Sequence, residues 1–416
     1  MSKLERATYG PANFQEAAGG ILPTQFPRTI GPNAMKYLQE VVDSGLASTA
    51  MLERFERAFA KEYGVRHFIA TPGCTPALAV LAAAFGFEPG DEIIVSPITD
   101  YGTVQGLVRE DLIPVFADTL PGTVNLGAES IEPCITDRTR AILAVHKTGT
   151  LCDMDPINAL ARRHGLVVCE DVCQAAFGEY KGRLAGTLGQ AGAFSFDSEK
   201  TMGSDLGGGI ATNDDELAER LRFIGQSRGA VQAPGFGRQH SEPGYAHRMA
   251  LCTAAISLAQ LEIVREQVAR RDRMIRLLAR LVGEIPGIVP LPIPAYMNVY
   301  SAWMFSLSLA PGQFRCTADE FAAQLVRAGI PGAGTGRYYL MPMALTFLQR
   351  NARQKRYPYS QPPASREFRY DERTCPTAWE FLQTWIRWAT FCEKYTEEHC
   401  ALAARIVGQV AEGNRK

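Results

Sequence analysis

Two neighbouring stretches, LVVCEDVCQA (166–175) and AFSFDSEKTMGSDLGGGIAT (193–212), predict the architecture of this chain. The first begins as an apolar strand and closes on Glu170 and Asp171. The second begins as another apolar strand and leads to Lys200 and then to three glycines. Strands of near-continuous apolar residues are typical of parallel sheets, which are buried on both faces. Ligands of such sheets bind beyond the carboxyl ends of the strands, so these charged residues indicate a binding site there.

The sequence before these stretches alternates short apolar runs with helical patterns. One helical pattern opens after Gly73, and another covers 155–165. This alternation predicts a doubly wound α/β domain with a mostly parallel central sheet flanked by helices. Further strands are predicted at HFIAT (67–71), EIIVS (92–96), IPVFA (113–117) and AILAVH (141–146).

The chain of 416 residues is long enough for more than one domain. We expect an N-terminal arm and helix over 1–47, a large α/β domain over 48–284 and a smaller α+β domain over 285–416. The proline-rich run IPGIVPLPIP (285–294) marks the second boundary. In the smaller domain the patterns predict a strand near 302–309 and helices near 317–328, 377–388 and 395–411, after a long helix over about 249–283.

Composition excludes several classes of protein. The net charge of −1 gives no basic field for nucleic acid or an anionic membrane. The uncharged run 67–87 contains two prolines and a glycine and fits a strand, turn and helix better than a membrane span. The ten cysteines show no CxxC or Cys/His spacing, so we expect no metal site and a reducing, cytoplasmic setting. The charged N-terminus has no apolar core of a signal peptide.

Three local patterns carry possible chemistry, and each has an ordinary structural alternative. TPGCTPA (71–77) can bind an anion at the start of a helix, or be a plain strand-to-helix turn. Asp171 can hold a proton on a cationic ring, or cap a helix or pair with an arginine. Lys200 can form a Schiff base, or lie on the surface. Ser195 could donate a hydrogen bond to a phosphate. Together these residues are the parts that a pyridoxal phosphate (PLP) site requires.

At this combination the sequence resembles the fold-type-I PLP enzymes and, more narrowly, the DegT/DnrJ/EryC1/StrS family of sugar and aminocyclitol aminotransferases. The resemblance runs from about Ser48 to Leu261 and continues weakly beyond. The segments that carry it are GCTPALAV (73–80), GDEIIVSPIT (90–99), PVFAD (114–118), TRAILAVHKTGTLCDMDPI (139–157), CEDVCQAAFGEYKGRLAGTLGQAGAFSFDSEK (169–200) and AISLAQLE (255–262).

The resemblance implies a role for each matching residue. Lys200 would form the imine with PLP and shuttle the proton, and Asp171 would pair with the pyridine nitrogen. Gln174 would contact the ring hydroxyl, and Tyr101 would stack on the ring. The phosphate would be held by Ser195 and by the backbone of Gly73, Cys74 and Thr75. Lys147 and Lys181 remain alternative imine lysines, although neither lies in the SF-x-x-x-K context.

The sequence also departs from the family pattern. Ala246 in GYAHRM (244–249) replaces an Asn that reaches the partner subunit's phosphate, so His247 or Arg248 would have to take over that contact. The region GRYYLMPMALTF (336–347) lacks the histidines of the nucleotide-sugar members. The basic stretch 349–373 is either a solvated loop or a loop that faces the substrate.

The function implied is a PLP-dependent aminotransferase, with pyridoxamine phosphate as the intermediate form, acting in amino-sugar, aminocyclitol or antibiotic biosynthesis. L-glutamate or L-glutamine would donate the amino group to a keto-sugar or a ketocyclitol. The alternatives are elimination, dehydration or aldol-type chemistry on the same cofactor, and a non-catalytic PLP-binding regulator. A homodimer with shared sites is expected. Candidate substrate contacts are Arg228, His240, His247, Tyr338 and Tyr339.

Overall fold

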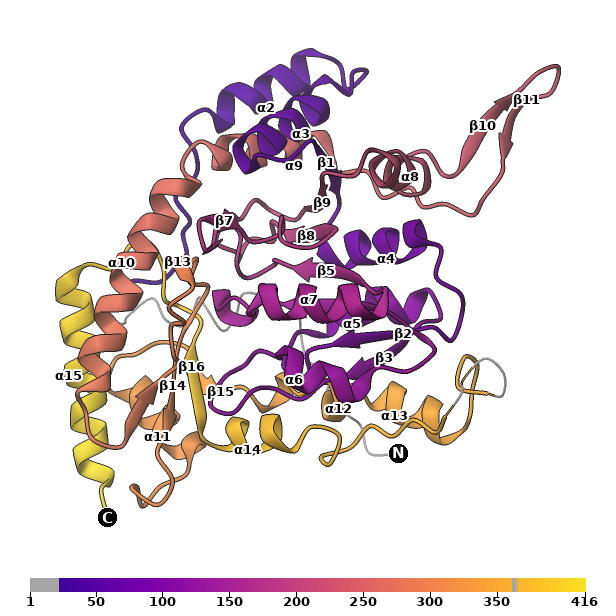
Figure 1. Ribbon diagram of the computed structural model, residues 1–416. Helices are drawn as coiled ribbons and strands as arrows, with labels where there is room; N and C mark the ends of the chain where they lie inside the picture. The colour runs from indigo at the N-terminus through magenta and orange to yellow at the C-terminus, as the bar shows by residue number, and fades with distance from the viewer. Residues whose placement is uncertain (1–21, 361–363, 365) are drawn as a thin grey trace, which may run out of the picture.

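The computed structural model describes residues 22–360, 364 and 366–416 (Figure 1). Its largest sheet has seven strands in the order β1-β9-β8-β5-β4-β2-β3. Its strands are β1 (His67–Thr71), β2 (Glu92–Val95), β3 (Ile113–Phe116), β4 (Thr139–Val145), β5 (Val167–Asp171), β8 (Ala191–Ser195) and β9 (Gly208–Thr212). The strands predicted between residues 67 and 196 all belong to this sheet, β9 was not predicted, and the strand predicted near 302–309 lies in a second sheet.

Strand direction gathers the loops of interest at one edge of the sheet. Every neighbouring pair is parallel except the two that involve β9, which runs antiparallel to both β8 and β1. The carboxyl ends of β1, β2, β4, β5 and β8 therefore lie at the same edge as the start of β9. The candidate site residues follow these ends, as predicted.

Helices cover both faces of the sheet, which explains the continuous apolar strands. In β4, Ile142 and Ala144 pack into one buried cluster, with residues of α3 (Ala50–Tyr63) and α7 (Met154–His164). Leu143 and Val145 pack into a second cluster, on the opposite face. That cluster contains residues of α4 (Cys74–Phe85), α5 (Tyr101–Arg109) and α8 (Asp215–Gly225). The predicted α/β class with a mostly parallel sheet is confirmed.

Most of the C-terminal part of the chain forms a second sheet and its flanking helices, at the lower left of Figure 1. Its four-stranded sheet has the order β12-β14-β16-β15, and α10 packs along α15 beside it. The predicted smaller α+β unit is therefore present. Its elements are α10 (Val264–Gly283), β12 (Ile288–Pro290), β14 (Phe305–Leu309), α11 (Ala318–Arg327), β15 (Ala333–Thr335), α12 (Met341–Ala344), α13 (Thr346–Arg353), α14 (Pro376–Thr384), β16 (Trp385–Trp388) and α15 (Glu397–Asn414).

Two helix predictions in this half were wrong in part. The helix predicted over 377–388 ends at Thr384, and WIRW forms β16, a central strand between β14 and β15. Its bulky side chains Trp385, Ile386 and Trp388 are buried, and the tertiary packing of these strand-forming residues outweighs the helical pattern. The helix predicted over 249–283 is two helices, α9 (Leu251–Leu261) and α10.

A buried ion pair joins α10 to the chain that follows β16. Arg271 is fully buried, and its Nη2 lies 2.6 Å from Oε2 of Glu393. Its Nη1 donates to the carbonyl of Ala302 at 2.9 Å. The stretch 349–373 also packs on the large sheet at its described positions: Arg366 pairs with Glu92, and the Tyr370 hydroxyl donates to the Pro114 carbonyl.

The N-terminal region and one hairpin complete the fold. Residues 1–21 of the predicted N-terminal arm lie outside the described residues, and the predicted helix is α2 (Ala34–Asp43), which packs on α9. The hairpin of β10 (Ala230–Ala233) and β11 (Gly237–His240) projects from the body beyond α8 (Figure 1). Among the described helices, none combines the length and the hydropathy that a bilayer crossing needs.

Candidate active site

The last two residues of β5 are both carboxylates, and the strand alternation sends them to opposite faces. Asp171 faces the start of α5: its Oδ2 accepts a hydrogen bond from the Thr103 hydroxyl at 2.7 Å, and its Oδ1 accepts one from the Cys173 backbone N–H at 3.0 Å. It is 3% exposed and has no ion pair with an arginine among the described residues. The carboxylate is thus oriented at the sheet edge by two neutral donors.

The second acid at this strand end, Glu170, is explained by its hydrogen bonds. It is fully buried and accepts hydrogen bonds from the backbone N–H groups of Gly186, Leu188 and Gly189, at 2.6–2.8 Å. Its Oε2 also lies 3.0 Å from Nε2 of His146. This acid therefore ties the β7–β8 connection to the sheet and has a structural role.

Lys200 lies in a loop that leaves and re-enters the sheet at the same edge, because β8 and β9 are antiparallel. The neck of the loop is closed by a hydrogen bond from the Phe196 N–H to the Gly207 carbonyl at 2.8 Å. The Nζ of Lys200 lies 4.3 Å from the ring centre of Trp303, whose indole N–H donates to the Glu199 carbonyl at 2.8 Å. The lysine is therefore held over the sheet edge and not on the surface.

The charges around Lys200 set its protonation before any ligand binds. Burial disfavours the ammonium form, but Cys173 and the acids Asp100, Asp197 and Glu199 favour it. The net effect raises the pKa of Lys200. The amine must therefore lose a proton before it can attack a carbonyl group.

The two alternative imine lysines differ sharply. Lys181 is about half exposed and pairs with Asp155 at 2.6 Å, away from the sheet edge. Lys147, directly after β4, is fully buried, and its Nζ has no hydrogen-bond partner among the described residues. This Nζ lies 3.3 Å from the ring centre of Tyr339. The structure thus places a second, unpaired amine close to the site.

Gln174 is positioned by the residue after Lys147. Its Oε1 accepts a hydrogen bond from the Thr148 backbone N–H at 2.8 Å, and Thr148 adopts a positive φ of 63°. The amide nitrogen of Gln174 has no hydrogen bond to any described residue. It is therefore a donor available to a ligand on the Asp171 side of the sheet edge.

The start of α4 forms an anion-binding end. The first N–H groups of the helix, at Cys74 and Thr75, follow Gly73 and have no acceptor among the described residues. The start of α5 packs closely against it: a Cβ on Gly102 would lie only 2.6 Å from Oγ1 of Thr75. Ser195 ends β8 opposite Gly208, and the start of α4 packs on Gly208 as well.

The remaining predicted residues fall into two groups. Tyr101 begins α5 and is 48% exposed. The rings of Tyr338 and Tyr339 are 4.1 Å apart at an interplanar angle of 37°, and Tyr339 lies next to Lys147. Arg228, His240 and His247 lie instead at the base of the projecting hairpin. There the His247 ring stacks on Tyr245, and burial lowers the pKa of His247. Within one chain these last three are not brought to Lys200.

Several residues of the site were not predicted. Thr103, Trp303 and Arg387 had no local signal, because each belongs to a segment whose place is set by tertiary packing. Cys173 was named only for its spacing, yet its sulfur, that of Cys74 and a carboxylate oxygen of Asp171 lie within 4.8 Å of one another. Burial raises the pKa of the Cys173 thiol well above its usual value, which disfavours the thiolate that metals prefer.

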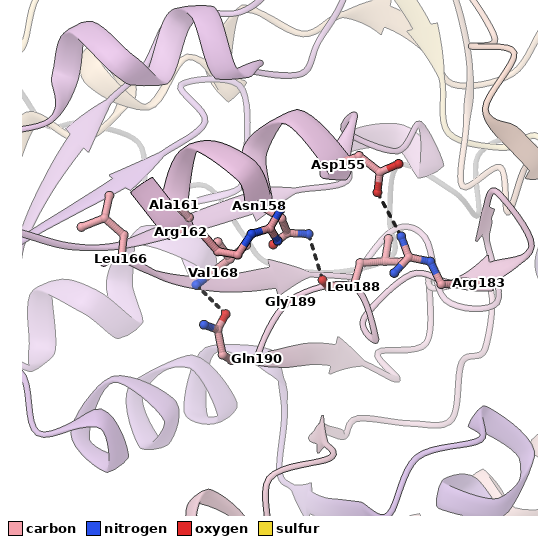
Figure 2. A pocket seen from close by; sticks show the side chains of 10 residues that line it. All are labelled: Asp155, Asn158, Ala161, Arg162, Leu166, Val168, Arg183, Leu188, Gly189 and Gln190. Carbon is pink, nitrogen blue, oxygen red and sulfur yellow. Dashed lines mark hydrogen bonds and ion pairs between the residues drawn. The ribbon is translucent and has the colours of Figure 1, made fainter. Parts of the chain in front are cut away.

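The hollow drawn in Figure 2 is a different place. It lies between α7 and the chain around β7 (Arg183–Leu184) and the start of β8, with Asp155 and Arg183 paired at one rim. It touches β5 at Val168, away from the Asp171 end, and its lining does not include Asp171, Gln174 or Lys200.

The fold and this edge of the sheet define a class of protein, the fold-type-I PLP enzymes. Comparison with known proteins narrows the class. Residues 28–376 match the DegT/DnrJ/EryC1/StrS aminotransferase family, so the chain belongs to this family. It is a PLP-dependent aminotransferase.

Relatives and solved structures agree with this assignment. The GDP-perosamine synthase of Caulobacter vibrioides is 37% identical over 306 residues, which are 73% of this chain and 81% of the relative. The spore coat polysaccharide biosynthesis protein SpsC of Bacillus subtilis is 36% identical over 277 residues, 65% of this chain and 71% of the relative. The fold is shared with 3-amino-5-hydroxybenzoic acid synthase (TM-score 0.81, 23% identity, 94% of this chain and 100% of the other). It is also shared with an aminotransferase from Psychrobacter cryohalolentis (TM-score 0.79, 24% identity, 94% and 99%).

The side chains present fit PLP. A partly buried amine, an oriented carboxylate, a free amide donor and uncapped helix N–H groups are the groups that its aldehyde, ring nitrogen, hydroxyl and phosphate require. They belong in that order to Lys200, Asp171, Gln174 and the start of α4 at Cys74. The absence of a side chain at Gly102 keeps the phosphate end open.

Proposed function

We propose that this enzyme transfers the amino group of L-glutamate or L-glutamine to a keto-sugar or a ketocyclitol. The observation that carries the proposal is that Asp171 and Lys200 lie at the same edge of the large sheet, at the end of β5 and in the loop after β8. The sugar products named for the GDP-perosamine synthase relative and the polysaccharide pathway named for the second relative support a sugar acceptor. An antibiotic-type or aminocyclitol setting is the alternative within the same reaction.

Asp171 would keep the cofactor in its reactive form. Bound PLP supplies an electron sink for the carbon that gains or loses a proton. Asp171 would hold the proton on the ring nitrogen, and the bonds from the Thr103 hydroxyl and the Cys173 N–H fix the orientation of its carboxylate. Gln174 would orient the ring by donating to its hydroxyl group.

Lys200 would move the proton during transfer. Its loop is closed at the base by the Phe196–Gly207 hydrogen bond, and its Nζ lies over the Trp303 indole. An amine in such a place can take a proton from the donor's α carbon and return it to the acceptor's carbon. The rest of the substrate would extend toward the C-terminal half, where Tyr338 is exposed.

A homodimer with shared sites is part of this proposal. The β10–β11 hairpin projects from the body (Figure 1), and a two-stranded hairpin is marginally stable alone. Phe236 at its tip is 73% exposed. A second copy of the chain would cover this hairpin and receive Arg228 and His247 at its own site. A cytoplasmic location is also proposed, since all ten cysteines are unpaired.

The domain division is proposed as 48–284 for the PLP-binding domain and 285–416 for the smaller one, after the arm and helix of 1–47. Helix α10 belongs to the first by sequence, but it packs on α15 and β12 of the second. It would therefore act as the connector between the two.

The test is a pair of half-reactions. The purified protein is loaded with PLP and mixed with L-glutamate or L-glutamine, and the absorbance change to the pyridoxamine form is followed. Addition of a keto-sugar or ketocyclitol should reverse the change and give an amino product detectable by mass spectrometry. A product that forms without exchange of the amino nitrogen would overturn the proposal.

A further inference from the structure

The loop that carries Lys200 is held by side chains that are distant from it in the sequence. This lysine loop covers residues 196–207, between β8 and β9. Within it the Lys200 N–H donates to the Asp197 carbonyl at 2.9 Å, which forms a turn. The carbonyls next to Lys200 accept hydrogen bonds from outside the loop, so the loop's own bonds do not fix this turn alone.

Arg28, in the segment before α2, supplies two of these outside donors. Its Nη1 donates to the Ser198 carbonyl at 2.9 Å, and its Nη2 donates to the Thr201 carbonyl at 3.1 Å. The two acceptors lie two residues before Lys200 and one residue after it, so one guanidinium spans this residue. The planar fork of an arginine holds two acceptors in a fixed relation, which a lysine ammonium on its flexible stem does not.

Gly203 makes room for this guanidinium. A Cβ on Gly203 would lie 2.9 Å from Cζ of Arg28 and 2.8 Å from the Asp197 carbonyl oxygen. The Gly203 carbonyl accepts a hydrogen bond from the buried Gln260 side chain at 2.8 Å, and Oε1 of Gln260 accepts one from the Gly31 N–H at 2.8 Å. The lysine loop is therefore packed directly against the segment that carries Arg28.

The charge of Arg28 has no ion-pair partner among the residues that the structure describes. Glu393 favours the charged form, but it is paired with Arg271 at 2.6 Å. Burial and the charge of Arg271 lower the pKa of Arg28 to about 10, so the guanidinium stays charged at neutral pH. The two loop carbonyls thus take the place of a carboxylate, and a hydrogen bond from a charged donor is roughly twice as strong as a neutral one.

The backbone just before Arg28 is fixed by the C-terminal half of the chain. Lys394 lies between β16 and α15, and its Nζ donates to three carbonyls of this segment, at 3.1, 3.4 and 2.5 Å: those of Thr24, Gln25 and Pro27. Arg28 therefore extends from a backbone that is held in place. Its guanidinium passes this fixed position on to the lysine loop.

We infer that Arg28 is a positioning residue for the transfer reaction, which sets the place of Lys200 by bridging the carbonyls on both sides of it. It acts through the backbone of the lysine loop and not by contact with the substrate. A proton carrier must lie within hydrogen-bond distance of the carbon that it serves, so a small displacement of the amine slows the transfer more than it weakens substrate binding. This inference rests on the role of Lys200 in the proposed function.

Chemical rescue of Arg28→Ala tests this role. The substitution removes the guanidinium, and Gly203 leaves its space open. In the PLP-loaded variant kcat should fall about 10²-fold, a usual cost of a misplacement of about 1 Å, while the KM for the amino donor changes little. Guanidinium ion, at concentrations that do not unfold the protein, should restore much of kcat. Ammonium ion should not, because it lacks the planar fork.

Hydrogen exchange of the protein without PLP gives a readout that does not depend on activity. Amides of residues 197–204 should exchange faster in Arg28→Ala, and guanidinium ion should slow them again, while the amides of β5 keep their wild-type rates. The matched control is Arg140→Ala. Arg140 also donates to two carbonyls, those of Asp137 and Thr139, but at the opposite end of β4. This variant should keep kcat and show no response to guanidinium ion.

Arg28→Lys keeps the charge and most of the volume, and it repeats the test if Arg28→Ala does not fold. Its kcat should stay well below that of the wild type, because one ammonium group does not replace the fork. Wild-type kcat in both variants would overturn the inference. So would a loss of kcat that guanidinium ion does not restore in folded Arg28→Ala, or one without faster exchange in the lysine loop.

Borohydride trapping separates this inference from the proposed function. In the wild type it should fix PLP on Lys200, and in Arg28→Ala the same residue should be fixed more slowly. If PLP is fixed on another lysine, the role of Lys200 fails and the inference fails with it. If Lys200 is fixed but neither amino donor reacts, the proposed function fails, and the trapping rate and the exchange rates still decide the role of Arg28.

Discussion

The two sides of the candidate site are built in different ways. The cofactor side consists of strand ends and helix starts of one mostly parallel sheet: Asp171 ends β5, and Gln174 and Lys200 lie on connections that leave its strands. The substrate side comes from the other half of the chain, where Trp303 and Arg387 reach the site from separate segments. The comparison indicates that the residues for cofactor chemistry are positioned by neighbouring segments of the large sheet. The residues expected to contact the substrate are positioned by the packing of the C-terminal part against that sheet.

The largest effect is expected at the centre of the cofactor side. Lys200→Ala should reduce turnover at least about 10⁴-fold, because it removes both the covalent attachment and the proton carrier. The imine absorbance and borohydride trapping at this position should disappear, as checked by spectroscopy and peptide mass spectrometry. If Lys200→Ala kept the imine absorbance, Lys147 would be the next candidate for the imine lysine, and the cofactor and substrate sides would not be separate.

Asp171→Asn should come next. Loss of the charge that keeps the ring nitrogen protonated should cut kcat by about 10²- to 10³-fold, a usual cost of removing one aligned electrostatic group. PLP should still bind, because Lys200 and the α4 start remain. If Asp171→Asn and the wild type had equal kcat at saturating amino donor, Asp171 would not be the residue that keeps the ring nitrogen protonated.

The neighbouring acid should show a different kind of loss. Glu170→Ala leaves three buried backbone N–H groups and His146 without their acceptor, and should lower the free energy of unfolding by about 3 kcal/mol or more. Chemical denaturation measures this change. Asp171→Asn is the matched comparison and should be far less destabilising, since its donors are a hydroxyl and one N–H. If both variants lost a similar free energy of unfolding, the assignment of a structural role to Glu170 and a catalytic role to Asp171 would be wrong.

Thr103 tests how much the positioning of Asp171 matters. Thr103→Val keeps the shape but removes the donor at 2.7 Å, and should reduce kcat about fivefold, equivalent to about 1 kcal/mol for one hydrogen bond. Thr103→Ser should recover most of the rate. A loss in KM alone would place Thr103 on the substrate side instead.

The smallest effect is expected on the substrate side. Tyr338→Phe removes a long hydrogen bond to Arg387 and keeps the ring that covers Tyr339. The KM for the amino donor should rise about twofold and kcat should hold, since a weak exposed contact is worth little. A large fall in kcat would show that this residue acts on the chemistry.

The contrast also explains what could be predicted from the sequence. The strands of the large sheet up to β8, and the positions of Lys200, Asp171, Gln174 and Ser195 at or next to strand ends, could be predicted because periodicity and motif lie within a few residues of each position. The strand at WIRW was predicted as a helix, since its burial between β14 and β15 is a tertiary fact. Arg387 lies on that strand, so its position next to the site could not be predicted either.

The same limit applies to Lys147 and Trp303. Nothing in HKTG reveals an ammonium without a partner, because the missing partner is defined only once Tyr339 closes over it. Trp303 looks like any core aromatic until its indole is found over Lys200. The roles of Arg228 and His247 remain predictions, since they depend on a second copy of the chain.

The reversed direction of β9 has a further implication for how such enzymes diversify. Since the segment 196–207 starts and finishes on one side of the sheet, its length can change without shifting any strand register. Insertions or deletions there would raise, lower or tilt the reactive amine while the supporting scaffold stays intact. A change in the length of this one loop would therefore be enough to move Lys200 and adapt the enzyme to substrates of different size.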